Sequence, residues 1–336
     1  MEVKYNIQLS HLNTLRLFSQ AEAMLCFTEQ AQLQKIVEIA SQFERIQVLA
    51  GGSNVVLKKH VPGLTIFMRS KGIHFTGENA QHYLVTVEAG ENWHHFVQYC
   101  LKQGWYGLEN LALIPGTVGA APMQNIGAYG VEVQQFIRWV EVFDWQGKEI
   151  YRLTAKECQF GYRDSIFKHE FPARWFVLRV GFAFPKQWVP VLDYPDLQQA
   201  PELAHEVSPW AIFTAVCRIR EKKLPNPKYL PNAGSFFKNP VVSLQQAWEL
   251  KKQWANLRLF KQNGQAKLAA GWLIEQAGWK GRRLGPLGMH KNQALVLVNH
   301  AADQACYNDI QQLKQKVQQA VYKQFKVHLE QEPVDI

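Results

Sequence analysis

The sequence predicts an α+β protein of two or three domains. Its 336 residues allow that number at about 100–200 residues per domain. The middle of the chain alternates short β-type segments with few helical ones, and a composition shift at residues 221–232 is followed by a helix-rich end. Apolar residues make up 47% of the chain and charged residues 19%, proportions typical of globular domains.

The first predicted elements are a helix and a strand. Residues 29–40 carry apolar side chains at helical spacing, and Ile46–Leu49 alternates as a strand does. We predict a second helix over Trp93–Gln103 because Gly104 supplies the residue type that commonly ends a helix. Further strands, each bounded by turn residues, are predicted over Leu64–Met68, Leu84–Glu88, Trp139–Phe143 and Trp175–Phe184.

Prolines and lysines between residues 221 and 232 predict a stiff, basic connector, and we place a domain boundary at its start. Beyond it, Lys267–Gln276 and Ile310–Phe325 have helical spacing, and we expect Asn308 to cap the second helix. A buried strand is expected over Ala294–Val298. These segments predict a two-layered, helix-rich terminal domain.

Composition excludes several classes of protein. The five cysteines are scattered and form no CxxC pair, so we expect buried or half-buried free thiols and no disulfide framework. The eleven histidines show no HExxH-type spacing, so no metal site is expected. The apolar runs are shorter than a membrane span, and the first residues contain no hydrophobic signal core. We therefore expect a cytoplasmic protein that does not bind membranes.

The formal net charge of +9 predicts attraction to anions. The basic residues are dispersed in short doublets and match no nucleic-acid-binding motif. Two interpretations remain open on this basis. Either the surface is merely basic, or the protein binds a ligand that carries phosphate.

Two glycine-rich segments suggest sites for anions. Residues 51–54 (Gly-Gly-Ser-Asn) follow a predicted strand, and consecutive backbone N–H groups in such a turn can bind phosphate oxygens. A plain β-turn explains this segment equally well, since neither GxGxxG nor a P-loop is present. Residues 115–130 hold four glycines and two prolines and predict an irregular loop against which a large flat ligand lies. Tyr129 in this loop either contacts such a ligand or belongs to the core.

Two further motifs offer catalytic groups. In Asn232-Ala233-Gly234-Ser235, the glycine and flanking turn residues predict a tight loop that presents one hydroxyl. An ordinary turn with a solvated serine is the alternative. Gly161-Tyr162-Arg163-Asp164 supplies a planar, permanently charged guanidinium suited to a carboxylate or an enolate. A surface pair between Arg163 and Asp164 is its alternative.

Five strings in this chain resemble those of the UDP-N-acetylenolpyruvoylglucosamine reductases (UDP-N-acetylmuramate dehydrogenases) and occur in the same order. The resemblance covers essentially the whole chain, and the segment around Tyr194 is similar to the longer, type I branch. The strings are AGGSN, LENLALIPGTVGAAPMQNIGAYG, LTAKECQFGYRDSIFK, NAGSFFKNP and KLAAGWLIEQAG.

The resemblance implies the fold and its division. We expect an FAD-binding module of the PCMH type (vanillyl-alcohol-oxidase-like), made of two subdomains, and a C-terminal α+β substrate-binding domain. The first flavin subdomain is expected over residues 1–70, with a C-terminal strand at 326–336 returning to it. The second is expected over 71–221 and the substrate-binding domain over 222–325.

The resemblance also implies a reaction, the reduction of UDP-N-acetylglucosamine enolpyruvate to UDP-N-acetylmuramate for peptidoglycan synthesis. Hydride passes from NADPH to non-covalent FAD, and then from flavin N5 to C3 of the enolpyruvyl ether. By resemblance, Ser235 donates a proton to C2 and Arg163 pairs with the enolate. Glu332 matches a C-terminal catalytic carboxylate, with Glu330 nearby as the alternative. We expect a monomer that binds no nucleic acid.

Binding residues follow from the same resemblance. Those implied for FAD are Gly51, Gly52, Ser53, Asn54, Pro115, Gly116, Thr117, Gly119, Asn125, Gly127 and Tyr129. Those implied for the UDP-sugar are Tyr162, Tyr194, Lys223, Asn239 and Gln293. Two other functions stay open: a related FAD oxidase that acts on an alcohol, and a catalytically silent nucleotide-sugar or nucleic-acid binder.

Overall fold

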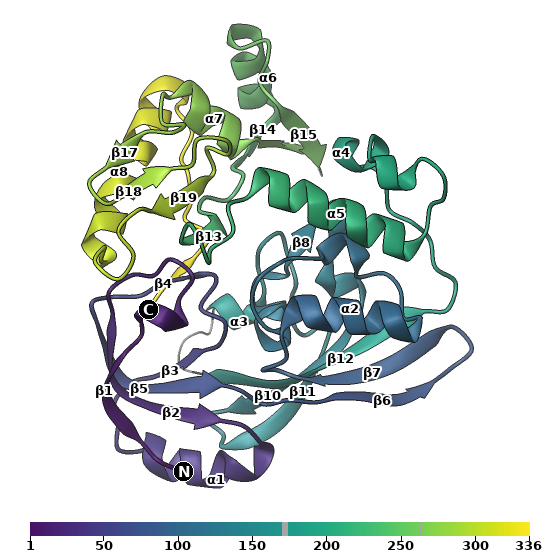
Figure 1. The fold of residues 1–336 in the computed structure, drawn as a ribbon, viewed down its shortest axis with the longest axis vertical. Coiled ribbons are helices and arrows are strands. Elements are labelled where there is room, and N and C mark those ends of the chain that lie inside the picture. Colours follow the sequence, from purple (N-terminus) through teal and green to yellow (C-terminus); the bar gives the residue numbers. More distant parts are fainter. Residues whose placement is uncertain (170–173, 263) are drawn as a thin grey trace. The chain divides into compact units, whose positions relative to one another are not determined.

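The computed structural model describes residues 1–169, 174–262 and 264–336 (Figure 1). These residues form two compact units, which we call unit 1 and unit 2. The chain crosses between them several times, so residues distant in sequence share a unit. Unit 1 comprises Met1–Ile7, Ala21–Gly52 and Pro62–Lys222, and unit 2 comprises Gln8–Gln20, Ser53–Val61 and Lys223–Ile336. The three-domain division expected from the sequence stays a prediction.

A four-stranded sheet brings together early parts of the chain. Its order is β1 (Lys4–Gln8), β2 (Gln20–Phe27), β5 (His60–Met68) and β3 (Ile46–Leu49). Strands β3 and β5 run parallel. The strand predicted at residues 46–49 is confirmed, and the one predicted at 64–68 starts four residues earlier. Helix α1 (Leu33–Ala40) follows a 3₁₀ turn at residues 30–32 and confirms the helix predicted over 29–40.

The largest sheet lies in unit 1 and is antiparallel throughout. Its order is β11 (Glu149–Thr154), β10 (Ile137–Asp144), β12 (Trp175–Pro185), β7 (His82–Glu88) and β6 (Ile73–Glu78). Three of these strands were predicted, each slightly shorter. Helix α2 (Trp93–Gln103) has the predicted bounds and packs against β12 (Figure 1), with the rings of Phe96 and Phe182 5.0 Å apart.

One helix, α5, was not predicted from the sequence. Helix α5 spans Pro209–Lys223 and buries Ile212, Ala215, Val216 and Ile219. The first residues of the predicted connector therefore belong to a helix. The smaller elements are α3 (Ile166–His169), α4 (Pro195–Gln198), β8 (Gly127–Ala128) and β9 (Val131–Glu132).

Unit 2 contains two small antiparallel sheets and three helices. One sheet has the order β13 (Asn232–Ser235), β19 (Val296–Asn299), β18 (Leu287–Met289) and β17 (Arg283–Leu284). The other has the order β14 (Val241–Ser243), β16 (Gln265–Leu268) and β15 (Leu259–Gln262). The helices are α6 (Leu244–Gln253), α7 (Ala270–Gln276) and α8 (Tyr307–Phe325). Strand β4 (Val55–Val56) pairs in parallel with β20 (Val334–Asp335).

Three predictions for this unit need correction. The helix predicted from residue 267 starts at Ala270, because Lys267 and Leu268 belong to β16, which pairs with β14 and β15. The strand predicted over residues 294–298 lies at 296–299. Helix α8 is capped at Cys306 rather than Asn308, since the Asp309 carboxylate accepts a 2.8 Å hydrogen bond from the Cys306 N–H. Its predicted apolar stripe is buried as expected.

The described residues also show the exposure of the cysteines and the character of the helices. All five cysteines are free, but Cys26 is exposed on β2, contrary to the expectation of buried or half-buried thiols. In the ranges described above, no cluster of three or more histidine, cysteine, aspartate or glutamate side chains is arranged to hold a metal ion. Among the same residues, no helix combines the length and apolar character of a membrane span.

Candidate active site

Two glycine turns in unit 1 make a close backbone contact. A Cβ atom placed on Gly51 would lie 2.9 Å from the Cα atom of Gly116. Gly52 and Gly116 have φ angles of +59° and +114°, in the region that glycine occupies without strain. The two segments predicted to bind FAD are therefore brought together, and their contact tolerates no side chain at Gly51.

The second glycine turn is fixed to the start of α2. Gly116 accepts a hydrogen bond from Trp93 N–H at 3.1 Å, and Gly119 N–H donates to the Ala89 carbonyl at 2.9 Å. The hydroxyl of Thr117 is buried and has no hydrogen-bond partner among the described residues. A buried hydroxyl without a partner is unfavourable, so a ligand atom at this turn would satisfy it. Pro115, at the start of the turn, is exposed.

Asn125 is used within the protein. It is fully buried with φ +44°, and its amide donates to Glu132 Oε2 and to the Gly161 carbonyl, both at 3.0 Å. Its side-chain oxygen accepts from Gln134 N–H at 3.1 Å. The side chain thus holds the loop in shape, and the Asn125 N–H also donates within the loop, to the Pro122 carbonyl at 3.3 Å. Short 3₁₀ turns at Val118–Ala120 and Pro122–Gln124 interrupt this otherwise irregular loop.

Arg163 is fixed against the same loop. Its Nη2 donates to the Gly127 carbonyl at 2.7 Å, and its guanidinium lies 5.4 Å from the ring centre of Tyr162. Its backbone has φ +53°, which is strained for a residue with a side chain. Asp164, the alternative partner in the sequence, pairs with His169 at 2.8 Å. The geometry therefore places the arginine beside the glycine loop.

An aromatic pair and a second arginine complete the cluster in unit 1. The rings of Tyr129 and Tyr194 meet edge to face, with centres 4.9 Å apart. Burial raises the pKa of Tyr129 to about 12. Arg220 of α5 carries a buried Nε that has no hydrogen-bond partner among the described residues, and the charges acting on it include those of Tyr129 and Arg163. Burial first, and then the like charge of Arg163, lower its pKa.

Unit 2 holds the serine. Strand β13 pairs with β19 through a register shift between Asn232 and Ser235, where Gly234 has φ +69°. The buried Asn232 side chain accepts from Gly234 N–H at 2.9 Å and donates to the carbonyls of Pro225 and Leu230. This bulge fixes the backbone that carries Ser235, whose side chain is half-buried.

The C-terminal segment runs beside the serine. Glu332 N–H donates to the Phe236 carbonyl at 2.9 Å, so Glu332 is bonded to the residue that follows Ser235. Val334 N–H donates to the Asn54 carbonyl at 3.0 Å, which brings the end of the first glycine turn to the same strand. The Glu330 side chain is 72% exposed and pairs with Lys238. Glu330 is thus committed to a surface ion pair, which favours Glu332 as the carboxylate near the serine.

Two predicted substrate residues of unit 2 contact the start of α7. The Asn239 side-chain oxygen accepts a hydrogen bond from Ala270 N–H at 2.9 Å, so only its amide N–H groups remain for a ligand. A Cβ on Gly271 would lie 3.0 Å from Gln293 Oε1.

Ser53 also belongs to unit 2, next to Asn54. Lys223 is the last residue of α5.

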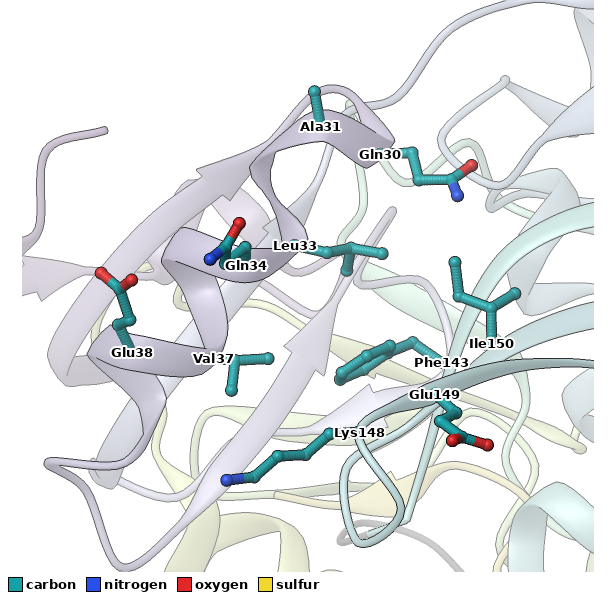
Figure 2. A pocket seen from close by; sticks show the side chains of 10 residues that line it. All are labelled: Gln30, Ala31, Leu33, Gln34, Val37, Glu38, Phe143, Lys148, Glu149 and Ile150. Carbon is teal, nitrogen blue, oxygen red and sulfur yellow. The ribbon is translucent and has the colours of Figure 1, made fainter.

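A separate hollow of about 800 Å³ lies between α1 and the β10–β11 hairpin (Figure 2). The side chains of Leu33, Val37 and Phe143 point into it, and Glu38 and Lys148 lie at its edge. None of the residues predicted for the site lines it. This hollow of unit 1 is therefore separate from the glycine turns of unit 1 and from the serine loop of unit 2.

Sequence reasoning missed one charged residue of the cluster in unit 1 and two residues that bond its loops. Arg220 was missed because the helix that carries it was not predicted, although Ile212, Val216 and Ile219 have helical spacing. His94 Nδ1 accepts from the Leu113 N–H at 3.0 Å, three residues before Gly116. Asn110 bonds two loop carbonyls. The last two have no signal in the sequence, because their partners are backbone groups.

Comparison with known proteins defines the class and then the family. Residues 21–151 match the model of an FAD binding domain, and residues 226–336 match that of the UDP-N-acetylenolpyruvoylglucosamine reductase C-terminal domain. The chain is therefore a flavin-binding oxidoreductase, and FAD is its cofactor.

The relatives narrow this class to one family. The UDP-N-acetylenolpyruvoylglucosamine reductase of Bordetella pertussis is 48% identical over 324 residues, which are 96% of this chain and 92% of the relative. That of Escherichia coli K12 is 46% identical over 330 residues, 97% of this chain and 95% of the relative. The chain belongs to the UDP-N-acetylenolpyruvoylglucosamine reductase family.

A solved structure supports the fold independently. The reductase of Thermus caldophilus is 23% identical, covers 100% of both chains and superposes with a TM-score of 0.70. Together with the two domain models, this similarity confirms the predicted fold class, a flavin-binding module followed by a C-terminal α+β domain. The alternative of a catalytically silent binder is excluded by family membership.

Proposed function

We propose that this chain reduces UDP-N-acetylglucosamine enolpyruvate to UDP-N-acetylmuramate with NADPH as the reductant. It would act as a cytoplasmic monomer in the synthesis of peptidoglycan precursors. The observation that carries the proposal is the serine loop of unit 2. There, Ser235 sits on a bulge held by Asn232, and Glu332 is hydrogen-bonded to the next residue.

The residues of unit 1 fit FAD. The Gly51–Gly116 contact lets backbone N–H groups approach a diphosphate without interference from side chains. The unpartnered hydroxyl of Thr117 offers a hydrogen bond at the same turn. The unpartnered Nε of Arg220 offers a second one, together with a positive charge. Each of these groups is unfavourable when left alone and is satisfied by an anionic ligand.

Bound FAD would supply the hydride chemistry that links NADPH to C3 of the enolpyruvyl ether. The electron pair left at C2 is delocalised into the substrate carboxylate. We assign Arg163 to stabilise this negative charge, a role that its permanent charge and fixed geometry allow. Tyr162, Tyr194, Lys223, Asn239 and Gln293 would bind the UDP-sugar.

Ser235 would then protonate C2. Its O–H bond breaks as the C2–H bond forms, and the serine oxygen regains a proton from solvent. We assign Glu332 to orient the reacting groups beside the serine, since its backbone is bonded to the Phe236 carbonyl. General acid catalysis of this kind contributes about 10²–10⁴-fold to the rate.

Two carboxamide substitutions and one alanine substitution test these roles. We expect Ser235→Ala to retain reduction of the flavin by NADPH and to lose steady-state turnover by about 10²-fold or more. We expect Glu332→Gln to lose turnover as well. Glu330→Gln is the matched control, because that side chain is exposed and paired with Lys238, and it should stay within about threefold of wild type. Stopped-flow absorbance separates the two half-reactions.

The outcomes discriminate between functions. Normal turnover in Ser235→Ala would remove the serine from its role. If Glu330→Gln lost turnover and Glu332→Gln retained it, the catalytic role would belong to Glu330 and not to Glu332. Reoxidation of the reduced wild-type enzyme by the enolpyruvyl substrate supports the proposal. If the enzyme turned over alcohols and not the enolpyruvyl substrate, its function would be that of the related alcohol oxidase.

A further inference from the structure

The 3₁₀ turn at Glu109–Leu111 in unit 1 carries two buried polar side chains that bond other segments of the chain. Asn110 is 1% exposed, and its side-chain nitrogen donates to the carbonyls of Tyr129 and Val191 at 2.8 and 2.9 Å. Tyr129 belongs to the glycine loop, and Val191 lies three residues before Tyr194. One amide group therefore joins the two segments that carry the paired tyrosines.

The neighbouring carboxylate strengthens this junction. Glu109 is 2% exposed, accepts from the Trp188 indole N–H at 2.6 Å and accepts from the Gly107 N–H at 2.7 Å. Trp188 is therefore bonded to the residue that precedes Asn110. The segment from Trp188 to Val191 is attached to the turn at both of its ends.

The glycine loop contacts the same segment directly. A Cβ on Gly130 would lie 2.9 Å from a methyl carbon of Val191, so the loop and the segment touch at this point. Tyr129 itself has φ +49°, a conformation that an L-residue keeps only when its surroundings hold it. The bond from Asn110 to its carbonyl is one such restraint. Beyond Val191, the carbonyl of Tyr194 accepts from the N–H of buried Leu197 at 2.9 Å.

We infer that Asn110 is a positioning residue that holds Tyr194 edge-on to Tyr129 and thereby sets the affinity for the UDP-sugar. This inference rests on the proposed function for the role of Tyr194. Without the amide, the carbonyls of Tyr129 and Val191 lose their donor, the strained backbone of Tyr129 relaxes, and the Tyr194 segment loses an anchor. The reacting groups are not touched, so substrate binding changes more than the chemical step.

The test uses the full-length, FAD-loaded protein with Asn110→Leu, which keeps the volume and removes both donors. We expect KM for the enolpyruvyl substrate to rise about tenfold, which corresponds to about 1.4 kcal/mol, while kcat stays within about threefold. In a double-mutant cycle, Tyr194→Phe should add little to Asn110→Leu, because that tyrosine is already displaced. Additive effects, or an unchanged KM, would overturn the inference.

Asn13→Leu is the matched control. Asn13 is a buried amide of unit 2 that donates to the carbonyls of Leu9, Ser10 and Leu17, so its loss measures the general effect of removing a buried amide. We expect it to lower the thermal midpoint and to leave KM unchanged. An equal rise of KM in both variants would reduce Asn110 to a stabilising residue.

Hydrogen exchange followed by mass spectrometry gives a readout that does not depend on activity. In ligand-free protein, Asn110→Leu should accelerate exchange over residues 188–198 and 127–131, and Asn13→Leu should not. Unchanged exchange overturns the inference, whereas absent turnover in the wild type overturns the proposed function instead. Should Asn110→Leu fail to fold, Trp188→Phe removes the bond to Glu109 and keeps an aromatic ring beside Tyr106, and we expect about a threefold rise in KM.

Discussion

Substituting Gly51 by alanine tests whether the contact of the two glycine turns binds the cofactor. The added methyl would lie 2.9 Å from the Cα atom of Gly116, closer than real Cβ contacts. That neighbour is backbone and cannot rotate away. Gly51 does not have a positive φ, so alanine adopts its backbone conformation without strain and the effect is purely steric.

The expected magnitude follows from this geometry. Overpacking by one methyl group in a tight contact typically costs about 1–3 kcal/mol. If the turns separate to relieve the contact, backbone N–H groups leave the positions that bind the diphosphate. At a factor of ten for each 1.4 kcal/mol, the dissociation constant of FAD should rise about 5- to 150-fold.

Titration of ligand-free protein with FAD, followed by flavin fluorescence, measures this change. Gly147→Ala is the matched control, because its Cβ would meet the Tyr151 hydroxyl at 3.4 Å, an ordinary contact, and its φ is also not positive. We expect the control to bind FAD as the wild type does. Wild-type affinity in Gly51→Ala would refute the assignment of this contact to the cofactor.

Two further predictions concern His94, which bonds the loop backbone, and Arg220, whose Nε has no partner among the described residues. Burial lowers the pKa of His94 below its usual 6.5, aided by His95 and Arg220. The stabilising bond from the Leu113 N–H to His94 Nδ1 is therefore complete above pH 6.5 and is lost as pH falls through the lowered pKa. His94→Asn, whose oxygen accepts the same bond without titrating, should flatten the decline of FAD affinity with falling pH, and an unchanged decline would contradict this. Arg220→Met should raise the thermal midpoint of ligand-free protein by about 2 °C, because a guanidinium with a buried, unpartnered Nε is removed, and should shrink the increase that FAD or the substrate produces. A lower ligand-free midpoint with full ligand stabilisation would contradict that reasoning.

Local signals explain why some elements were predicted to the residue. Helix α2 begins after Asn92, whose side chain accepts from the His95 N–H at 3.0 Å, and ends at Gly104 with φ +77°. Both signals lie within a few residues of the helix they bound. The stripe of α8 was likewise visible, because helical periodicity of apolar residues persists over its whole length.

Elements fixed by distant partners were not predictable in this way. Residues 267–268 were predicted to begin the following helix, yet they belong to β16, which pairs with both β14 and β15. Helix α5 ends in Glu221, Lys222 and Lys223, whose charges and the prolines beyond them indicate a connector. Tertiary contacts decided both cases, and they also decide which side chains support the site.

In the candidate site, the residues proposed to react were predictable from the sequence, and the groups that position them were not. Ser235, Arg163 and Glu332 were named from the sequence because their residue types carry the chemistry of the family that the chain resembles. Their placement depends on groups with no such signature, such as the Asn232 amide beneath the serine and the Gly127 carbonyl that fixes the arginine. A sequence motif therefore identifies the reacting groups well, but it does not identify the groups that hold them in place.

Backbone strain in unit 1 shows why some loop residues need groups that hold them in place. Leu113, Asn125, Tyr129 and Arg163 all have φ between +44° and +55°, where residues with side chains are disfavoured by roughly 1 kcal/mol each. Each is held by a particular hydrogen bond: His94 to the first, Glu132 and Gly161 to the second, Asn110 to the third and Gly127 to the fourth. Stability alone would favour glycine at these positions. The proposed function gives a reason for the side chains to persist there with their restraints, because a backbone held in one shape presents its groups to a ligand without reordering. On that proposal, the restraining residues belong to the functional site as much as the residues that they hold.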